Sequence, residues 1–151
     1  MQVYIASDHA GFKLKEKIKN ELGKLGFEVK DFGPFSYDKD DDYPDFVRPV
    51  AEAVASDSEN SRGIILGASG QGEAILANRF KNVRAVVFFG DNLEIIKLSR
   101  EHNNANVLSL GAHFLSEEEA KVAVKLWLET PFSGEERHIR RIRKIDQKES
   151  C

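Results

Sequence analysis

A glycine-rich segment ending in a glutamate contains the residue types in this sequence that most clearly suggest chemistry. Residues 68–73 read Ala-Ser-Gly-Gln-Gly-Glu and lie between an apolar run and a helical pattern. Glycines permit a tight turn with outward-pointing N–H groups, and a helix N-terminus adds partial positive charge. Ser69, Gly70 and Gly72 can therefore hold a phosphate or stabilise an oxyanion, although an ordinary glycine turn is the alternative. The segment matches a dinucleotide fingerprint poorly, because Ile75 stands where a third glycine is expected.

Glu73 has two interpretations at this position. A carboxylate in the first turn of a helix is stabilised by the helix dipole, and this alone can explain the residue. Beside a glycine loop, it can also act as a general base that removes a proton from carbon. The dipole would lower its pKa and burial in a closed site would raise it, and the sequence leaves open which effect dominates.

Two histidines follow or end predicted elements. Asp8-His9 comes directly after the first predicted strand, and His102-Asn103 ends a predicted helix. Histidine can donate to a sugar oxygen or bind phosphate, and we expect one cleft at the strand ends to gather both. A surface or capping role is the alternative for each. No HExxH or Cys/His spacing supports a metal site.

Arg137 and Arg141 are four residues apart, so they share one face of a predicted C-terminal helix. Their guanidinium groups have the fork geometry that suits phosphate oxygens. A solvated helix face is the alternative. A nucleic-acid patch is a third interpretation, but no aromatic residues are interleaved with these charges.

The elements that must position these residues alternate along the chain. Strands are predicted at residues 3–6, 27–32, 63–67, 83–89 and 106–110, and helices at 12–25, 44–55, 73–80, 92–102, from 116 and at about 136–148. The alternation predicts one α/β domain over residues 1–151, with a three-layer Rossmann-like fold and a parallel sheet of about five strands. Ligands of such sheets bind beyond the carboxyl ends of the strands, which selects the loops at 8–9, 68–73 and 111–113. The order of the strands is not predicted.

Composition narrows the classes of protein. The net charge of −3 argues against a bulk nucleic-acid binder. Cys151 is the single cysteine, so no disulfide can form within one chain, which suits a reducing compartment. The first residues do not resemble a signal peptide, and no apolar run approaches membrane-spanning length. We therefore expect a cytoplasmic protein without a membrane partner.

Taken in order, several segments resemble the ribose-5-phosphate isomerase B family, which includes the galactose-6-phosphate isomerase subunits. Each motif is short, but the ordered set is specific and covers nearly the whole chain. The matching segments are residues 6–11, 42–45, 67–73, 77–79, 99–103, 106–108 and 134–138.

The resemblance implies an enzyme that interconverts ribose 5-phosphate and ribulose 5-phosphate through an enediolate, without metal or organic cofactor. One branch of the family uses a cysteine base at the position that Gly67 occupies here, and this chain resembles the other branch, in which Glu73 is the base. The resemblance also implies roles for other residues. Ser69, the amides that follow it and Asn103 would stabilise the enediolate. His102 and Asp8 would assist ring opening. His9, Arg137 and Arg141 would bind the phosphate, and Tyr43 would line the sugar pocket.

The resemblance also implies a homodimer or homotetramer in which each active site draws residues from two chains, with the C-terminal helix packing on the partner. His113 stands where family members often have an arginine, and we expect it in the phosphate subsite. Two alternatives remain open. One is an isomerase of a six-carbon sugar phosphate, of the galactose- or allose-6-phosphate type. The other is a non-catalytic module that binds a sugar phosphate or a nucleotide.

Overall fold

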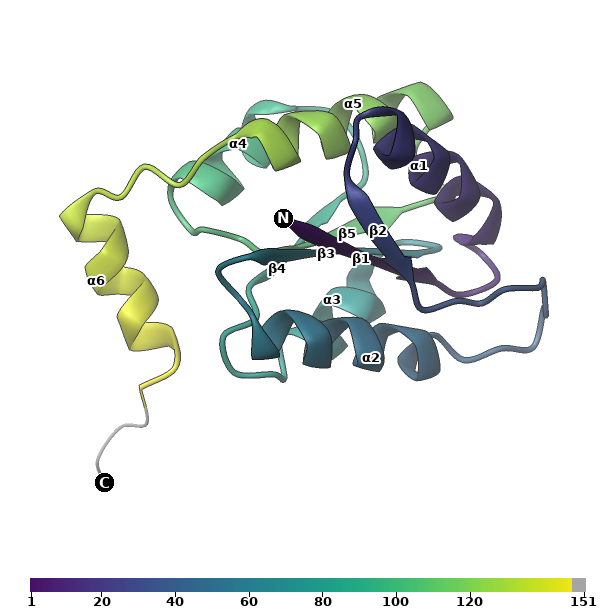
Figure 1. Cartoon of the computed structure of the whole chain (residues 1–151), viewed down its shortest axis with the longest axis horizontal. Coiled ribbons are helices and arrows are strands. Elements are labelled where there is room, and N and C mark those ends of the chain that lie inside the picture. The colour runs from purple at the N-terminus through teal and green to yellow at the C-terminus, as the bar shows by residue number, and fades with distance from the viewer. Residues whose placement is uncertain (148–151) are drawn as a thin grey trace.

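Five parallel strands form a single sheet in the computed structural model, which describes residues 1–147 (Figure 1). The strand order is β2-β1-β3-β5-β4, and every neighbouring pair is parallel. Because the chain moves from β1 to one side and then to the other, the switch point lies between β1 and β3, where ligands of such sheets bind. The strands are β1 (Gln2–Ser7), β2 (Glu28–Asp31), β3 (Ser61–Gly67), β4 (Ala85–Phe88) and β5 (Val107–Gly111).

Helices cover both faces of the sheet, which confirms the predicted three-layer α/β fold (Figure 1). One face carries α1 (Phe12–Lys24), α4 (Glu94–Glu101) and α5 (Glu117–Glu129), and the other carries α2 (Tyr43–Ser56) and α3 (Gln71–Ala77). The helix α6 (Glu136–Ile145) stands apart from both layers (Figure 1). No helix within residues 1–147 combines the length and the apolar character that a membrane-spanning segment needs.

The core explains why the middle strand carries a continuous apolar run at residues 63–66. Ile64 and Leu66 of β3 are fully buried under α1 and α5, whereas Ile65 is fully buried against α2. A strand covered on both faces needs apolar residues at every position, which is typical of parallel sheets. The sheet is therefore held between two apolar layers, and its strand ends form a rigid edge for the loops.

The predicted boundaries are confirmed to within a few residues, with one clear difference. Gly26 ends α1 with φ of +81°, and Ser116 forms a capping box with Glu119. The last helix was expected to extend to residue 148 but ends at Ile145. An acidic residue is unfavourable at a helix C-terminus, and Asp146 instead accepts a hydrogen bond from the N–H of Asn82 at 3.3 Å. Lys148 and Cys151 lie outside the described residues.

Candidate active site

The three loops selected from the sequence lie side by side at the carboxyl edge of the sheet. The in-register ends of β1, β3 and β5 bring them together, since Gly67 pairs with Gly111 and Ser7 pairs with Leu66. Backbone hydrogen bonds then join the loops, from Asp8 N–H to Leu66 at 3.3 Å, from Ala112 N–H to Gly67 at 2.8 Å and from His113 N–H to Ala68 at 3.1 Å.

The carboxyl group of Glu73 fills the space that a side chain at position 67 would occupy. A Cβ atom built on Gly67 would overlap the Glu73 carboxyl group, and even the farther oxygen, Oε2, would lie only 2.7 Å away. Glu73 projects from the first turn of α3 back over the end of β3, and its residue is only 4% exposed. Glycine at position 67 is therefore a requirement for this placement of the carboxylate.

Burial raises the pKa of Glu73, and the nearby carboxylate of Asp8 raises it further. Its own backbone N–H opposes these effects. Asp8 is itself only 8% exposed, and its Oδ1 accepts the N–H of Gly11 at 3.0 Å. Of the two effects that the sequence left open, desolvation is the larger, and it raises the proton affinity of Glu73.

The glycine loop is shaped by close packing on both sides. Gly70 has φ of +76°, and a Cβ there would lie 2.9 Å from Oγ of Ser109, which donates to the Gly70 carbonyl at 2.6 Å. A Cβ on Gly72 would lie 2.9 Å from the hydroxyl oxygen of Tyr43, the first residue of α2. Ser69 Oγ accepts the N–H of Gln71 at 3.4 Å. The structure therefore brings Tyr43 together with the glycine loop.

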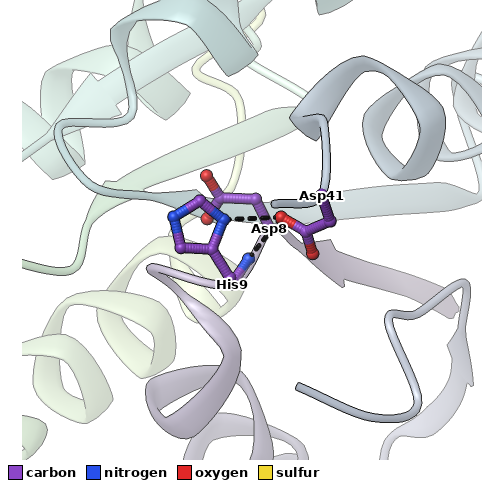
Figure 2. Close-up of side chains that lie close together, drawn as sticks. All are labelled: Asp8, His9 and Asp41. Carbon is purple, nitrogen blue, oxygen red and sulfur yellow. Dashed lines mark hydrogen bonds and ion pairs between the residues drawn. The ribbon is translucent and has the colours of Figure 1, made fainter. Parts of the chain in front are cut away.

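His9 is held by a residue that sequence reasoning missed. Figure 2 shows the carboxylate of Asp41 against the His9 ring, where Nδ1 lies 2.6 Å from Asp41 Oδ1. The same oxygen accepts the backbone N–H of His9 at 3.0 Å. The Asp41 hydrogen bond is the main cause that raises the pKa of His9, and burial opposes it. Asp41 belongs to an acidic stretch that carries no periodic pattern, so the sequence does not single it out.

Asp8, His9 and Asp41 offer ligand atoms within 4.8 Å of one another, which is close enough for the three residues to be considered as ligands of one metal ion. The contact of 2.6 Å between Nδ1 and Oδ1 has the length of a charge-assisted hydrogen bond. Two atoms bound to one zinc ion at about 2.0–2.2 Å in tetrahedral geometry lie farther apart than that. The arrangement is that of a hydrogen-bonded pair beside Asp8.

His102 and Asn103 lie at the opposite, amino edge of the sheet. The helix α4 follows β4 and runs antiparallel to the strands, so its end at His102 lies close to the start of β5 at Val107. The expectation that one cleft gathers His9 and His102 is therefore wrong for a single chain, because the helix between two parallel strands carries its last residues back to the strand starts.

Arg137 and Arg141 lie at the same amino edge, on α6. The ring of His138 stacks on His102 with centroids 4.3 Å apart, and Asp146 bonds to Asn82 just before β4. Both arginines are exposed, and Arg137 pairs with Glu135 at 2.8 Å. Burial lowers the pKa of His138, and the neighbouring His102 lowers it further. The sequence-predicted site is thus split into two groups at opposite edges of one chain.

A mostly apolar surface follows the free edge of β4 and connects the two groups. Three hollows lie along this surface. The first contains Ser69, Phe89 and Phe114, and the last contains His102 and Asn103. The hollow between them is lined by residues from Val87 to Leu98 and shares lining residues with both. Phe89 and Phe114 are 50% and 63% exposed and pack edge to face with centroids 6.2 Å apart. Such an exposed apolar patch is typical of a protein interface.

Comparison with known proteins gives consistent results. Residues 3–145 match the family model described as Ribose/Galactose Isomerase. The chain is 43% identical to a protein of Mycolicibacterium paratuberculosis named ribose-5-phosphate isomerase B, over 94% of this chain and 87% of the relative. A crystal structure of ribose-5-phosphate isomerase B from Mycoplasma genitalium with bound ribulose-5-phosphate is similar, with a TM-score of 0.91, 40% identity and coverage of 95% of this chain and 93% of that chain. The ribose 5-phosphate isomerase structure from Thermotoga maritima has a TM-score of 0.88, 43% identity and coverage of 96% and 97%.

Proposed function

The chain belongs to the ribose/galactose isomerase family, and from this premise we propose that it interconverts ribose 5-phosphate and ribulose 5-phosphate with Glu73 as the base. The observation that carries the proposal is the Glu73 carboxyl group, buried over Gly67 at the switch point of the sheet, with its pKa raised by that burial.

The reaction needs one base and no redox partner. The base removes the proton from C2 of the open-chain aldose, which leaves an enediolate. It then returns a proton to C1 while the proton of the O2 hydroxyl passes to O1, which gives the ketose. A carboxylate with raised proton affinity suits both steps, because it accepts the proton from carbon and then gives it back. Ser69 and the amides that follow it lie next to Glu73, where they are placed to stabilise the developing oxyanion.

The sugar and its phosphate require further groups at the same edge. Tyr43 covers the glycine loop and lines the sugar pocket. His9 and His113, which flank the loop, face the phosphate, and Asp8 assists ring opening beside Glu73. The remaining groups, His102, Asn103, Arg137 and Arg141, are expected to come from the partner subunit, because they lie at the far edge of their own chain.

A two-fold contact along β4 and α4 would complete the site. In a symmetric dimer the same surface meets itself, and an antiparallel contact along β4 sets the carboxyl edge of one chain opposite the amino edge of the other. The free edge of β4 and the exposed Phe89, Ile95 and Phe114 support this arrangement. It also gives α6, whose only buried residue is His138, a partner surface to cover.

The test is a substrate screen with the purified chain. Ribose 5-phosphate is expected to yield ribulose 5-phosphate, and the product formed in deuterated water should carry deuterium at C1. Allose 6-phosphate and galactose 6-phosphate, tested in parallel, report on the six-carbon alternative. Binding of ribose 5-phosphate without turnover or exchange would contradict the proposal and identify a non-catalytic module.

A further inference from the structure

The contact between Asp41 and His9 can set both the charge and the orientation of the imidazole ring. One carboxylate oxygen accepts both the backbone N–H of His9 at 3.0 Å and the ring at 2.6 Å. The Asp41 side chain is only 6% exposed, whereas His9 remains 35% exposed. The buried partner is thus the acid, and the accessible partner is the ring that can meet a ligand.

The geometry fixes which nitrogen carries the first proton. An ionised carboxylate only accepts hydrogen bonds, so Nδ1 must be the donor toward Asp41. The other nitrogen, Nε2, points away from Asp41 (Figure 2), and none of the hydrogen bonds within residues 1–147 uses it. When His9 is also protonated at Nε2, that nitrogen presents an N–H with positive charge to the carboxyl edge of the sheet.

The charged groups around His9 favour the cation, and burial opposes it. Asp8 and Asp38 add negative charge near Asp41, and Tyr37 packs edge to face against the ring with centroids 6.4 Å apart. The second oxygen of Asp41, Oδ2, is buried without a hydrogen-bond partner in the described part of the chain. A buried carboxylate that lacks part of its hydrogen bonding is stabilised by a neighbouring cation, which protonated His9 supplies.

We propose that Asp41 is a positioning residue of the phosphate subsite, which holds His9 as an imidazolium with its Nε2–H directed at the phosphate of the substrate. This inference rests on the proposed function for the identity of the ligand. Asp41 itself touches neither substrate nor reacting atoms. It acts through His9, and it makes phosphate affinity depend on the acidic loop before α2.

The experiment compares Asp41→Asn with Asp40→Asn, a matched loss of one charge from the same loop at an exposed residue that pairs with Lys39. The His9 imidazole is titrated by NMR in the full-length protein, with its signal identified by its absence in His9→Gln. The affinity for inorganic phosphate is measured on the same samples across pH. Inorganic phosphate is used because its binding does not depend on turnover.

Asp41→Asn should lower the pKa of His9, and Asp40→Asn should leave it nearly unchanged. Between the two His9 pKa values the native ring is a cation and the ring of the Asn variant is neutral, so phosphate affinity should fall about ten- to a hundredfold in that window, the range for loss of a charged hydrogen bond. At lower pH both rings are protonated and the difference should shrink. The kcat for ribose 5-phosphate should change much less than KM.

Three results would overturn the proposal. The first is an unchanged His9 titration in Asp41→Asn. The second is a shifted His9 titration in Asp41→Asn while the phosphate affinity of this variant equals that of Asp40→Asn. The third is a loss of affinity from Asp41→Asn that persists in a His9→Gln background, because a residue that acts through His9 has no effect once His9 is gone. If Asp41→Asn does not fold, Asp41→Glu keeps the charge and should keep a raised His9 pKa, and an ordinary value there refutes the pairing. Absence of isomerase activity in the native protein would instead refute the proposed function, while the titration and phosphate measurements remain readable.

Discussion

Replacing Gly67 by alanine displaces the proposed base without removing it. The added methyl group would occupy the position of the Glu73 carboxyl group, so the two groups cannot coexist in their present places. The backbone of Gly67 does not require glycine for its own conformation, because its φ is not positive. The substitution therefore tests the placement of Glu73 rather than the stability of β3.

The size of the effect follows from the contact distances. The farther carboxylate oxygen lies 2.7 Å from the new carbon, which is about 1 Å inside the normal contact range. The nearer oxygen must move more, so the carboxyl group has to retreat by about 1 Å or more. A misplacement of about 1 Å in a catalytic group can reduce the rate about 10²-fold. As the carboxylate leaves its buried position, the main cause of its raised pKa also weakens.

The assay is the pH dependence of kcat for ribose 5-phosphate. Gly67→Ala should reduce kcat about 10²-fold, and the acidic limb of the profile should move to lower pH, because a base with lower pKa stays ionised at lower pH. Gly63→Ala is the matched control in the same strand. Its methyl group would press on Val50 at 2.9 Å, so it should cost about 1–3 kcal/mol of stability by overpacking but leave kcat unchanged. A folded Gly67→Ala protein with native kcat and an unshifted acidic limb would refute the reasoning.

Three further predictions concern stability, assembly and the phosphate subsite. At pH values above 7, Glu73→Gln should have a higher Tm than the native protein. A carboxyl group with a raised pKa binds its proton more tightly in the folded state, so the native protein loses stability as pH rises from the ordinary glutamate pKa through the raised pKa. Each tenfold difference in proton affinity is worth about 1.4 kcal/mol of stability, which corresponds to a Tm shift of roughly 3–6 °C at this chain length. A lower Tm for Glu73→Gln than for the native protein, measured by calorimetry, would contradict the prediction. Mixing Glu73→Gln subunits with subunits carrying Arg137→Ala and Arg141→Ala should restore part of the lost activity, because one site of a mixed dimer then has neither defect. If no activity returns after subunit exchange is confirmed, Glu73 and the two arginines belong to a site within one chain. His113→Arg should lower the KM for ribose 5-phosphate at pH 8, because it adds a fixed charge beside the glycine loop, and an unchanged KM would exclude residue 113 from the phosphate subsite.

The sequence predicts the elements and the carboxyl-edge group well because both depend on local rules. Apolar runs bounded by glycines mark the strands, and parallel strands that end in register necessarily gather the residues that follow them. Asp8, Ser69 and Glu73 were found in this way. The direction of the Glu73 pKa shift was not predictable, because it depends on how deeply the side chain is buried over Gly67.

What the sequence does not predict depends on contacts between distant segments. The strand order results from packing of both helical layers, and no local pattern encodes it. Asp41 differs from its acidic neighbours only in meeting His9, 32 positions away. Lys15 is fully buried with its ammonium group on Asp31 at 2.9 Å, and no local pattern marks this lysine as buried. The separation of His102 from His9, by contrast, follows from the predicted alternation of elements, because a helix between two parallel strands ends beside the strand starts.

The most direct test of Glu73 as the base is the turnover of Glu73→Gln, which keeps the shape of the side chain and removes its basicity. With ribose 5-phosphate as substrate, kcat should fall about 10²- to 10⁴-fold, the usual contribution of a general base. Incorporation of deuterium from the solvent should fall in parallel, while the affinity for inorganic phosphate stays at the native value. Near-native kcat in a folded Glu73→Gln protein would contradict the account.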